Sequence, residues 1–574
     1  MTPPPVLDVW APRARRLDLL VGDRRLPFRA GDGGHWQREP PPPGVDYALS
    51  IDGGPPRPDP LSRWQPHGVH GPSRWIDLDG FAWTDAGFQA GTLATAVIYE
   101  LHVGTFSPTG TFDGAIAHLD HLAALGVTHV ELMPVATFPG RRGWGYDNVL
   151  LGAVHDAYGG PAGLHRFVDA CHARDLAVVI DVVWNHVGAD GAYLRELGPY
   201  LHEGRHTPWG PALNLDGDGS DEVRGFLLAC ARRWLVDYHA DGLRLDAVDA
   251  MIDDAAIPFV EELAGCVGAL AGTHGRALTL IAESDRNDPR LVQRPPRGGL
   301  GLDAQWSDDL HHAIHAAITG ERAGYYVDFG RVADVATALT RGFVYDGKPS
   351  RYRGHRHGRP LVDVSGHRLI GYAQTHDQVG NRPRGERLVH LAGHDLARVA
   401  AALVFVAPHT PMLFQGEEWA ASTPFPYVAE LADPLLAAAM RDGRRRDLAE
   451  LGWTSEALDP TAADTFAAAV LRWPEVEAEP HRDMLSWYRA LIALRRARPE
   501  LRDGRWAAVD ARTDEVARWL AIGRGAVTLV ANLGAAPHVH RVGPGELALG
   551  SRLGVRLADG MLELPPASCG FVVA

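Results

Sequence analysis

A regular alternation of short apolar segments with amphipathic ones, between residues 95 and 501, constrains the fold most strongly. Eight segments have the apolar composition of buried strands: 96–106, 128–135, 177–187, 242–248, 278–284, 302–309, 369–377 and 411–419. Helical patterns lie between or after them at 113–126, 160–175, 222–240, 395–407 and 481–501. Eight such units in order predict an α/β protein with a closed parallel (β/α)8 TIM barrel. An open doubly wound sheet is the alternative, but it usually has fewer strands and a glycine-rich phosphate loop, and the chain contains neither GxGxxG nor GxxxxGK[ST].

The alternation is absent from both ends of the chain, where short strands are expected instead. The first 88 residues are rich in Pro and Gly, and they contain strand candidates at 6–12, 15–21 and 45–51. Strand candidates return after residue 503, at 518–523, 526–533, 554–564 and 569–574. We therefore predict an N-terminal β-sandwich over 1–88 (immunoglobulin-like, similar to a carbohydrate-binding module), a catalytic barrel over 89–502 and a C-terminal all-β domain over 503–574. The sandwich is expected to pack on the barrel or wall its cleft rather than to bind glycan itself.

Charge and cysteine usage exclude several classes of protein. The formal net charge is −15 with a pI near 6.0, which argues against binding to nucleic acid or to an anionic membrane. No uninterrupted apolar run approaches the roughly 20 residues that span a bilayer, and residues 1–16 lack a signal-type apolar segment. The four cysteines (Cys171, Cys230, Cys266 and Cys569) are scattered. These features favour a soluble cytoplasmic protein with reduced thiols.

Polar residues gather where the predicted barrel strands end. They are Asn185, His186, Arg244, Asp246, Glu283, Asp308, Asp309, His376 and Asp377. The C-terminal ends of barrel strands share one face, on which active sites lie. Arg244 and Asp246 are two residues apart and so point to the same side, where the guanidinium is expected to hold the carboxylate ionised. Three carboxylates without a metal motif (Asp246, Glu283 and Asp377) suit glycoside hydrolysis, which needs an acid and a second carboxylate.

Four short segments resemble the signature regions of the α-amylase superfamily of glycoside hydrolases. They are DVVWNH (181–186), GLRLDAVDA (242–250), IAESD (281–285) and THDQ (375–378). The resemblance implies that Asp246 is the nucleophile, Glu283 the general acid/base and Asp377 the group that stabilises the transition state. It further implies that Arg244 orients Asp246, and that His186, His376 and Tyr146 (in WGYDN) bind the ring on the cleaved side.

Other segments resemble one branch of that superfamily, which cleaves the α-1,4 bond next to the terminal trehalose of malto-oligosyltrehalose. They are 207–217, 282–290, 303–312, 319–326, 376–388 and 413–427. The resemblance implies a substrate supplied by a malto-oligosyltrehalose synthase. Candidates for recognising trehalose are Asp249, Trp306, Asp308, Asp309, His311, Gln378, Asn381 and Arg382. The chain departs from the pattern at Asp249, where the branch often has His, and at Thr375, where it often has Asn.

The resemblance makes the mechanism retaining, with two carboxyl groups about 5–5.5 Å apart, and Glu283 is expected to have the raised pKa. We expect no cofactor and no metal: His311 and His315 are four residues apart on a helix, but no carboxylate or Cys completes a familiar motif. Three alternatives are weighed against this interpretation. The segments 376–388 and 307–312 argue against a glucan branching or debranching enzyme of the same superfamily, and the three carboxylates argue against a non-catalytic glycan-binding scaffold. A metal-dependent barrel hydrolase would need His/Asp clusters at the strand ends, which the sequence does not show.

Overall fold

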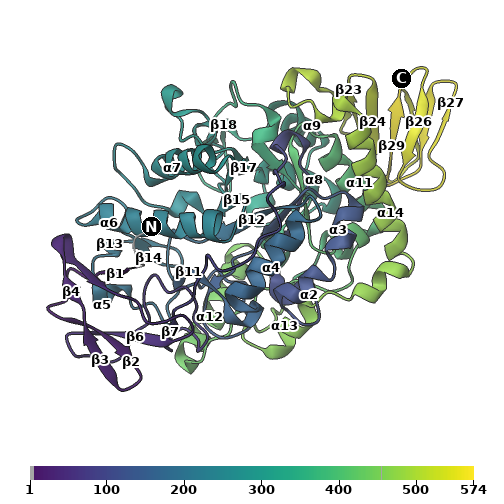
Figure 1. Ribbon diagram of the computed structural model, residues 1–574. Coiled ribbons are helices and arrows are strands. Elements are labelled where there is room, and N and C mark those ends of the chain that lie inside the picture. The colour runs from purple at the N-terminus through teal and green to yellow at the C-terminus, as the bar shows by residue number, and fades with distance from the viewer. Residues whose placement is uncertain (1–5, 454) are drawn as a thin grey trace.

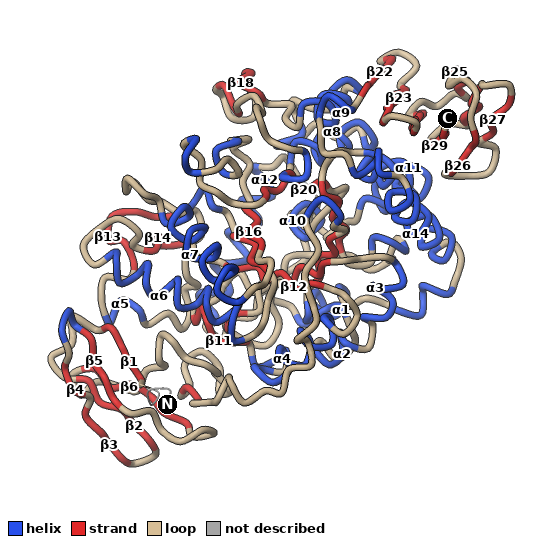
Figure 2. Tube along the Cα trace, turned by 45° about the horizontal axis from the view of Figure 1, so that its top comes forward, coloured by secondary structure: helices blue, strands red, loops and turns tan. Residues whose placement is uncertain are grey.

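The computed structural model describes residues 6–453 and 455–574, with the barrel between two β-domains (Figure 1). The barrel strands are β8 (Ile98–Leu101), β9 (His129–Leu132), β12 (Ala177–Val182), β15 (Gly242–Leu245), β16 (Thr279–Ala282), β17 (Ala304–Trp306), β20 (Leu369–Gly371) and β21 (Thr410–Phe414). All eight are parallel, and β21 pairs with β8, which closes the sheet. Figure 2 shows strands of the barrel (red), among them β12, β16 and β20, at the centre with helices (blue) around them. The predicted TIM barrel is therefore confirmed. All eight strands are shorter than the predicted segments, because most of the polar residues at the C-terminal ends of those segments belong to loops or helices.

The barrel interior has an apolar layer below a charged one. The apolar cluster consists of Ala96, Ile98, Val179, Ile281, Ala304, Trp306, Ile370, Tyr372 and Met412. Two residues beyond Ile98, Val179 and Ile281 stand Glu100 in β8, Asp181 in β12 and Glu283 immediately after β16. They face the same way because side chains alternate along a strand. Register places Glu131 beside Glu100 and Arg244 beside Asp181. The fold thus gathers five ionisable groups at one level of the barrel.

Helices cover the barrel, including those predicted from amphipathic patterns. They are α1 (Val103–Phe106), α2 (Phe112–Ile116), α3 (Leu119–Leu125), α4 (Gly160–His172), α5 (Leu194–Leu197), α6 (Ser220–Arg232), α7 (Phe259–His274), α8 (Asp308–Thr319), α9 (Val332–Arg341), α10 (His376–Gly380), α11 (Leu388–Val406), α12 (Pro434–Glu450), α13 (Ala463–Ala469) and α14 (His481–Ala497). A π-helical turn, Arg233–Asp237, extends α6. In the described part of the chain, α11 alone is long and apolar enough to cross a membrane. Its second half is buried, and the helix packs against α8, α14 and β29. Its apolar residues therefore form part of the core around the barrel.

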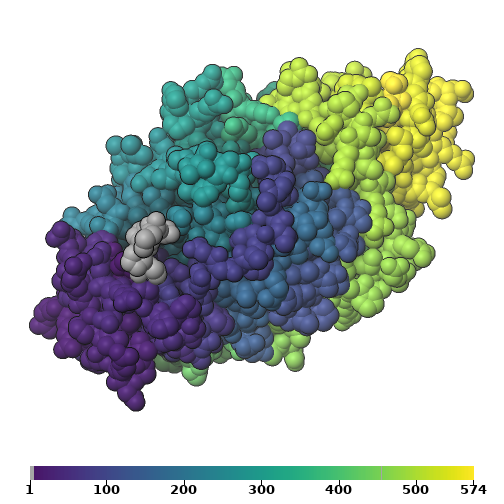
Figure 3. All heavy atoms as spheres, in the orientation of Figure 1, coloured from purple at the N-terminus to yellow at the C-terminus, as the bar shows by residue number. Residues whose placement is uncertain are grey.

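The N-terminal domain consists of two small antiparallel sheets. One has the order β1 (Leu7–Trp10), β5 (His35–Arg38), β4 (Arg29–Ala30); the other has the order β3 (Arg24–Pro27), β2 (Leu17–Val21), β6 (Asp46–Ile51), β7 (Ser73–Arg74). Leu17, Leu19 and Leu49 are fully buried between them. In Figure 3 this domain (purple) lies directly against the part of the barrel coloured blue and teal.

The C-terminal domain is all-β, as expected, and it has two antiparallel sheets. The larger one has the order β22 (Asp510–Asp514), β23 (Trp519–Arg524), β24 (Val527–Asn532), β29 (Ser568–Val573), β26 (Glu546–Gly550). The smaller one has the order β25 (His538–Arg541), β28 (Met561–Leu564), β27 (Arg556–Ala558). Arg524 fastens this domain to the barrel, because its buried guanidinium donates to the carbonyl of Val406 at the end of α11.

Three further hairpins leave the barrel and were not predicted. They are β10 (Ala136–Thr137) with β11 (Leu150–Val154), β13 (Leu201–Thr207) with β14 (Gly210–Leu213), and β18 (Asp346–Pro349) with β19 (Arg356–Gly358). The hairpin β13–β14 follows strand β12, and β18–β19 precedes strand β20. The tip of β13–β14 carries Trp209 and the tip of β18–β19 carries Tyr352; both residues lie at the mouth of the barrel.

Candidate active site

Arg244 is the centre of the charged layer. Its side chain is fully buried, and Nη1 donates to Asp181 Oδ2 at 2.9 Å and to Asp246 Oδ1 at 3.0 Å. Nη2 lies 3.0 Å from Glu283 Oε2. Burial would lower the pKa of Arg244, but Asp181 and Glu283 outweigh it and raise that pKa well above the ordinary value. One permanently charged guanidinium therefore holds carboxylates from three strand ends together.

Asp246 lies immediately after β15, between Arg244 and a second donor. Asn185 Nδ2 donates to Asp246 Oδ2 at 2.7 Å and to its carbonyl at 3.1 Å. Burial raises the pKa of Asp246 to about 6, although Arg244 and Asn185 both act to lower it. The expectation that Arg244 favours the ionised form is correct in direction, but burial has the larger effect. Asp246 is thus ionised only above about pH 6.

Glu283 lies immediately after strand β16, close to Asp246. The backbone amide of Ala247 donates to its Oε2 at 2.8 Å, and its side chain is 21% exposed toward the cleft. Burial raises the pKa of Glu283, Asp246 adds to this rise, and Arg244 opposes it. We expected a raised pKa to distinguish Glu283, but Asp246 and Asp377 also have raised pKa values, so this property does not distinguish it.

Asp377 occupies the first turn of α10, close enough to Glu283 and Asp246 for their charges to interact. Asn381 Nδ2 donates to Asp377 Oδ1 at 2.9 Å, and Arg444 in turn donates to Asn381 Oδ1 at 2.6 Å. Thr375 is fully buried and caps α10: its hydroxyl accepts from the Asp377 amide and donates to Gln378 Oε1. The side chain of Asp377 remains 40% exposed, so it is available to a ligand.

Tyr146, His376 and Glu100 form a chain of hydrogen bonds beneath the cleft. The Tyr146 hydroxyl donates to Asp181 Oδ2 at 2.6 Å and lies 2.9 Å from His376 Nε2; the two rings are stacked. Burial lowers the pKa of His376 to about 4 and raises that of Glu100 to about 8, so both groups are neutral at pH 7. Because Tyr146 donates to Asp181, His376 Nε2 donates to Tyr146, and its Nδ1 accepts from the protonated Glu100.

A cleft of about 520 Å³ opens above these groups at the C-terminal end of the barrel. Six residues predicted from the sequence line it: Asp249, Glu283, Asp308, Asp377, Gln378 and Asn381. Asp249 accepts from the Ser284 hydroxyl and pairs with Arg286 at 3.2 Å, and burial raises its pKa to about 6. Asp308 accepts from the Tyr372 hydroxyl, and burial raises its pKa to about 8. His186 lies beside the cleft, with its ring 5.6 Å from that of Trp209.

Four other predicted residues are directed into the protein instead. Asp309 accepts from the amides of Val344 and Tyr345, and from Asn287. Both ring nitrogens of His311 are bonded, to the Ala373 carbonyl and the Tyr326 hydroxyl. Arg382 forms a bidentate pair with Glu321 at 2.7 and 2.9 Å. Trp306 lies under Arg244, with the guanidinium 4.2 Å from its ring.

Sequence reasoning missed several residues of the site. Glu100, Glu131 and Asp181 are buried in the charged layer, and a signal existed, because each is the lone acid of a short buried strand. The cleft lining also includes His206, Trp209, His312, Tyr325, Tyr352 and Arg353, most of them on hairpins or loops without a periodic pattern. Within residues 6–453 and 455–574, no group of three or more His, Cys, Asp or Glu side chains could hold a metal ion.

Comparisons with known proteins agree with this architecture. The family described as "Alpha amylase, catalytic domain" matches residues 72–209, and a domain of unknown function, DUF3459, matches 504–571. The chain is 51% identical to malto-oligosyltrehalose trehalohydrolase of Arthrobacter ramosus over 86% of this chain and 87% of that protein. It is 45% identical to the protein of the same name from Rhizobium sp. (strain M-11), over 98% and 97%.

A solved structure is similar along nearly the whole chain. The crystal structure of a putative alpha amylase from Salmonella typhimurium superposes with a TM-score of 0.90 at 34% identity, covering 99% of this chain and 97% of that one. Both flanking β-domains are therefore included in the similarity, together with the barrel.

Proposed function

The chain belongs to the malto-oligosyltrehalose trehalohydrolases of the α-amylase superfamily, and from this premise we propose which of its residues perform the reaction. It is a glycoside hydrolase that acts on malto-oligosyltrehalose and releases trehalose and a malto-oligosaccharide. Relatives of that name extend over most of the chain, so a branching or debranching activity is not favoured.

In the first step that we propose, Glu283 protonates the glycosidic oxygen that joins the maltodextrin to trehalose. Asp246 attacks the anomeric carbon, the carbon–oxygen bond breaks, and trehalose leaves. In the second step Glu283, now ionised, takes a proton from water, which displaces Asp246 and gives a malto-oligosaccharide of retained α configuration. Asp377 binds hydroxyl groups of the distorted ring.

The observation that carries this assignment is the position of Arg244. Its guanidinium contacts one oxygen of Asp246 and one of Glu283, each at 3.0 Å, so the two carboxyl groups are neighbours; Glu283 lines the cleft, whereas Asp246 is buried beside it. A retaining enzyme requires such neighbours, about 5–5.5 Å apart. The surroundings of the two groups differ. Asn185 donates to Asp246 and favours its ionised form, whereas the side chain of Glu283 is more exposed than that of Asp246.

Selection of trehalose is proposed to depend on polar residues of the cleft lining. Asp249, Asp308, Gln378 and Asn381 offer acceptors and donors to the leaving disaccharide, and a site built to hydrogen-bond rejects ligands that leave its groups unpaired. Arg244, His186, His376 and Tyr146 would support the ring on the cleaved side. Asp309, His311, Arg382 and Trp306 are assigned to holding the surrounding loops and the barrel floor in place.

The cellular setting is also a proposal. We assign the enzyme to the cytoplasm, where a malto-oligosyltrehalose synthase would supply its substrate and no cofactor is used. The four cysteines are free in the described part of the structure, and three of them are buried, which suits a reducing compartment.

Product analysis tests the proposal. Purified protein is incubated with maltotriosyltrehalose and, separately, with maltopentaose, and the sugars are resolved by chromatography. Rapid release of trehalose and maltotriose with little attack on maltopentaose is expected. Comparable cleavage of both would remove the trehalose specificity. The Glu283→Gln variant should lose turnover while retaining binding; full activity in that variant would overturn the assignment of the acid.

A further inference from the structure

The hairpin β13–β14 brings an indole to the mouth of the cleft. Trp209 is 58% exposed and belongs to the cleft lining, with its ring 5.6 Å from that of His186. Thr207 shapes the turn, since its hydroxyl accepts from the amides of Trp209 and Gly210. A half-exposed indole at the rim of a sugar cleft offers a flat apolar face to a ring. Its position depends on what holds the base of the hairpin.

The N-terminal domain contacts the start of the hairpin, at Tyr200, through buried aromatic residues. Tyr200, which precedes β13, is buried, and its hydroxyl donates to the carbonyl of Trp10 at 3.0 Å. The two rings meet edge to face, with centroids 5.1 Å apart. A Cβ atom on Gly219 would lie 2.9 Å from the Trp10 ring, and one on Gly198 would lie 3.0 Å from Pro12. Glycine at both positions therefore permits the close approach of the two domains.

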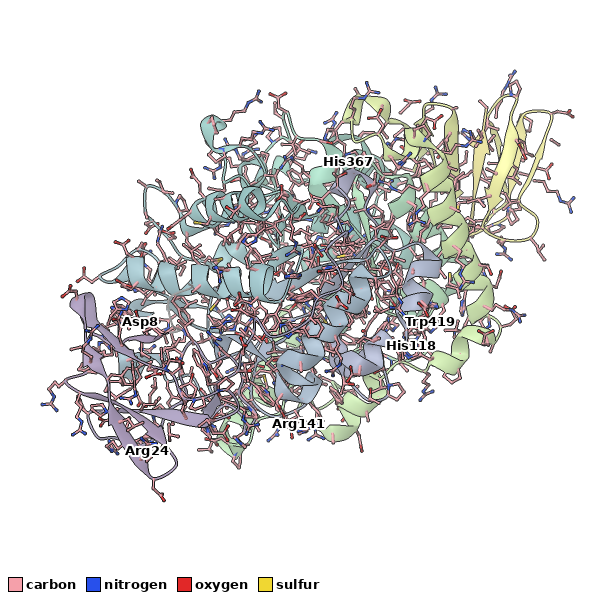
Figure 4. All side chains as sticks on the ribbon, viewed as in Figure 1. Asp8, Arg24, His118, Arg141, His367 and Trp419 are labelled. Atoms are coloured by element: carbon pink, nitrogen blue, oxygen red, sulfur yellow. The ribbon has the colours of Figure 1, made fainter. Side chains whose placement is uncertain are left out.

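Ion pairs from the N-terminal domain reach the same segment. Arg57 pairs with Glu196 of α5 at 2.8 Å and lies 4.2 Å from the ring of Tyr193. Arg13 pairs with Glu203 on β13 at 3.2 Å. A further contact reaches α6, where His35 bridges Asp8 and Glu222; Asp8 is labelled in Figure 4 where the two parts of the chain meet. Residues before the hairpin, within it and after it in the sequence therefore all contact the N-terminal domain.

We propose that the N-terminal β-sandwich is part of the substrate-binding apparatus: it holds the hairpin so that Trp209 lies against the bound oligosaccharide. Arg13, Arg57 and Trp10 are then positioning residues that act through Trp209 and touch no substrate themselves. This inference rests on the proposed function, because it supposes that the cleft binds a sugar chain. It gives the N-terminal domain a role in affinity without a glycan site of its own.

The test removes the two arginines together. The double variant Arg13→Ala/Arg57→Ala is expected to raise KM for maltotriosyltrehalose about two- to fivefold with little change in kcat, the size that exposed ion pairs permit. Arg15→Ala is the matched control, because its exposed pair with Asp52 lies within the N-terminal domain. The control should leave KM and kcat unchanged.

The same double variant is then made on Trp209→Ala. If the arginines act through Trp209, they raise KM no further in that background. A full additional rise in KM would overturn the proposal, and so would an unchanged KM in the first background. Hydrogen exchange of peptides covering 201–213 should speed up in the double variant and not in Arg15→Ala. Hydrogen exchange needs no turnover. A protein that releases no trehalose would contradict the proposed function, but the effect of the N-terminal domain on the hairpin could still be measured by exchange.

Discussion

The backbone amide of Ala247 donates a hydrogen bond of 2.8 Å to the carboxyl group of Glu283, which ties the loop after Asp246 to the neighbouring strand. Ala247 adopts the left-handed conformation, with φ +39°, which costs a residue with a Cβ of order 1–2 kcal/mol. The strain is located between the two residues assigned to proton transfer and attack. A strained backbone at such a place fits a site that fixes geometry at the expense of stability.

Replacing Ala247 with Gly is predicted to separate strain from function. The strain disappears but the unfolded chain gains freedom, so the free energy of unfolding should change by less than about 1 kcal/mol. The amide is then less firmly aimed at Glu283, and kcat should fall several-fold with KM nearly constant. Urea denaturation and steady-state kinetics measure both. An unchanged kcat would show that the hydrogen bond to Glu283 does not depend on the local conformation.

The pH profile should report Asp246. Its pKa is about 6, so kcat/KM is expected to fall as the pH falls through that value and the nucleophile becomes protonated. Asn185 lowers this pKa by its hydrogen bond to the carboxylate. The Asn185→Ala variant should therefore shift the acidic limb to higher pH, in addition to lowering the maximum rate. An acidic limb that stays in place while the rate falls would assign the limb to another group.

Glu131 gives a prediction about stability and pH. Burial raises its pKa to about 8, and Glu100 beside it has the same value. Between the ordinary pKa near 4.5 and the raised one, the folded protein binds more protons than the unfolded chain. The free energy of unfolding should therefore decrease as the pH rises from about 4.5 to about 8, as far as these two groups determine it.

The Glu131→Gln variant removes one titrating group and keeps the shape of the side chain. We expect it to be more stable than the unmodified protein at pH 8.5, with a smaller loss of stability between pH 5 and pH 8. Thermal unfolding across that range is the measurement. If the plot of stability against pH shifts as a whole without a change in slope, the pKa of Glu131 does not differ between the folded and unfolded states.

The barrel could be predicted from the sequence because parallel strands buried on both faces read as apolar runs, and eight of them with helices between leave few topologies. The polar strand ends were informative for the same reason: Arg244 and Asp246 interrupt a run that is otherwise apolar. Glu100 and Glu131 interrupt their strands equally. The sequence alone assigns them no role, because an acid inside a strand does not show whether its side chain reaches the cleft.

Other features could not be read from local pattern. Asp308 and Asp309 are consecutive in the first turn of α8, and their side chains diverge by about 100° around the helix, so only one can face the cleft. The sequence does not say which of them does. The hairpin that carries Trp209 has a register shift between Leu201 and His206 and depends on a domain some 190 residues earlier, which leaves no periodic signal.

Arg382 distinguishes a residue that binds substrate from one that supports the site. Its guanidinium is 7% exposed, pairs with both oxygens of Glu321, and lies 4.4 Å from the ring of Trp453. Replacing Glu321 with Gln removes the bidentate partner of a buried cation and leaves only Glu386, 3.8 Å away, so it should lower the free energy of unfolding by up to about 3 kcal/mol. Arg382→Met removes the cation, leaves Glu321 partly exposed to water, and should cost less. For both variants KM should stay within twofold of the unmodified enzyme below the unfolding temperature. A KM that rises tenfold in Arg382→Met with stability unchanged would return Arg382 to the residues that bind trehalose.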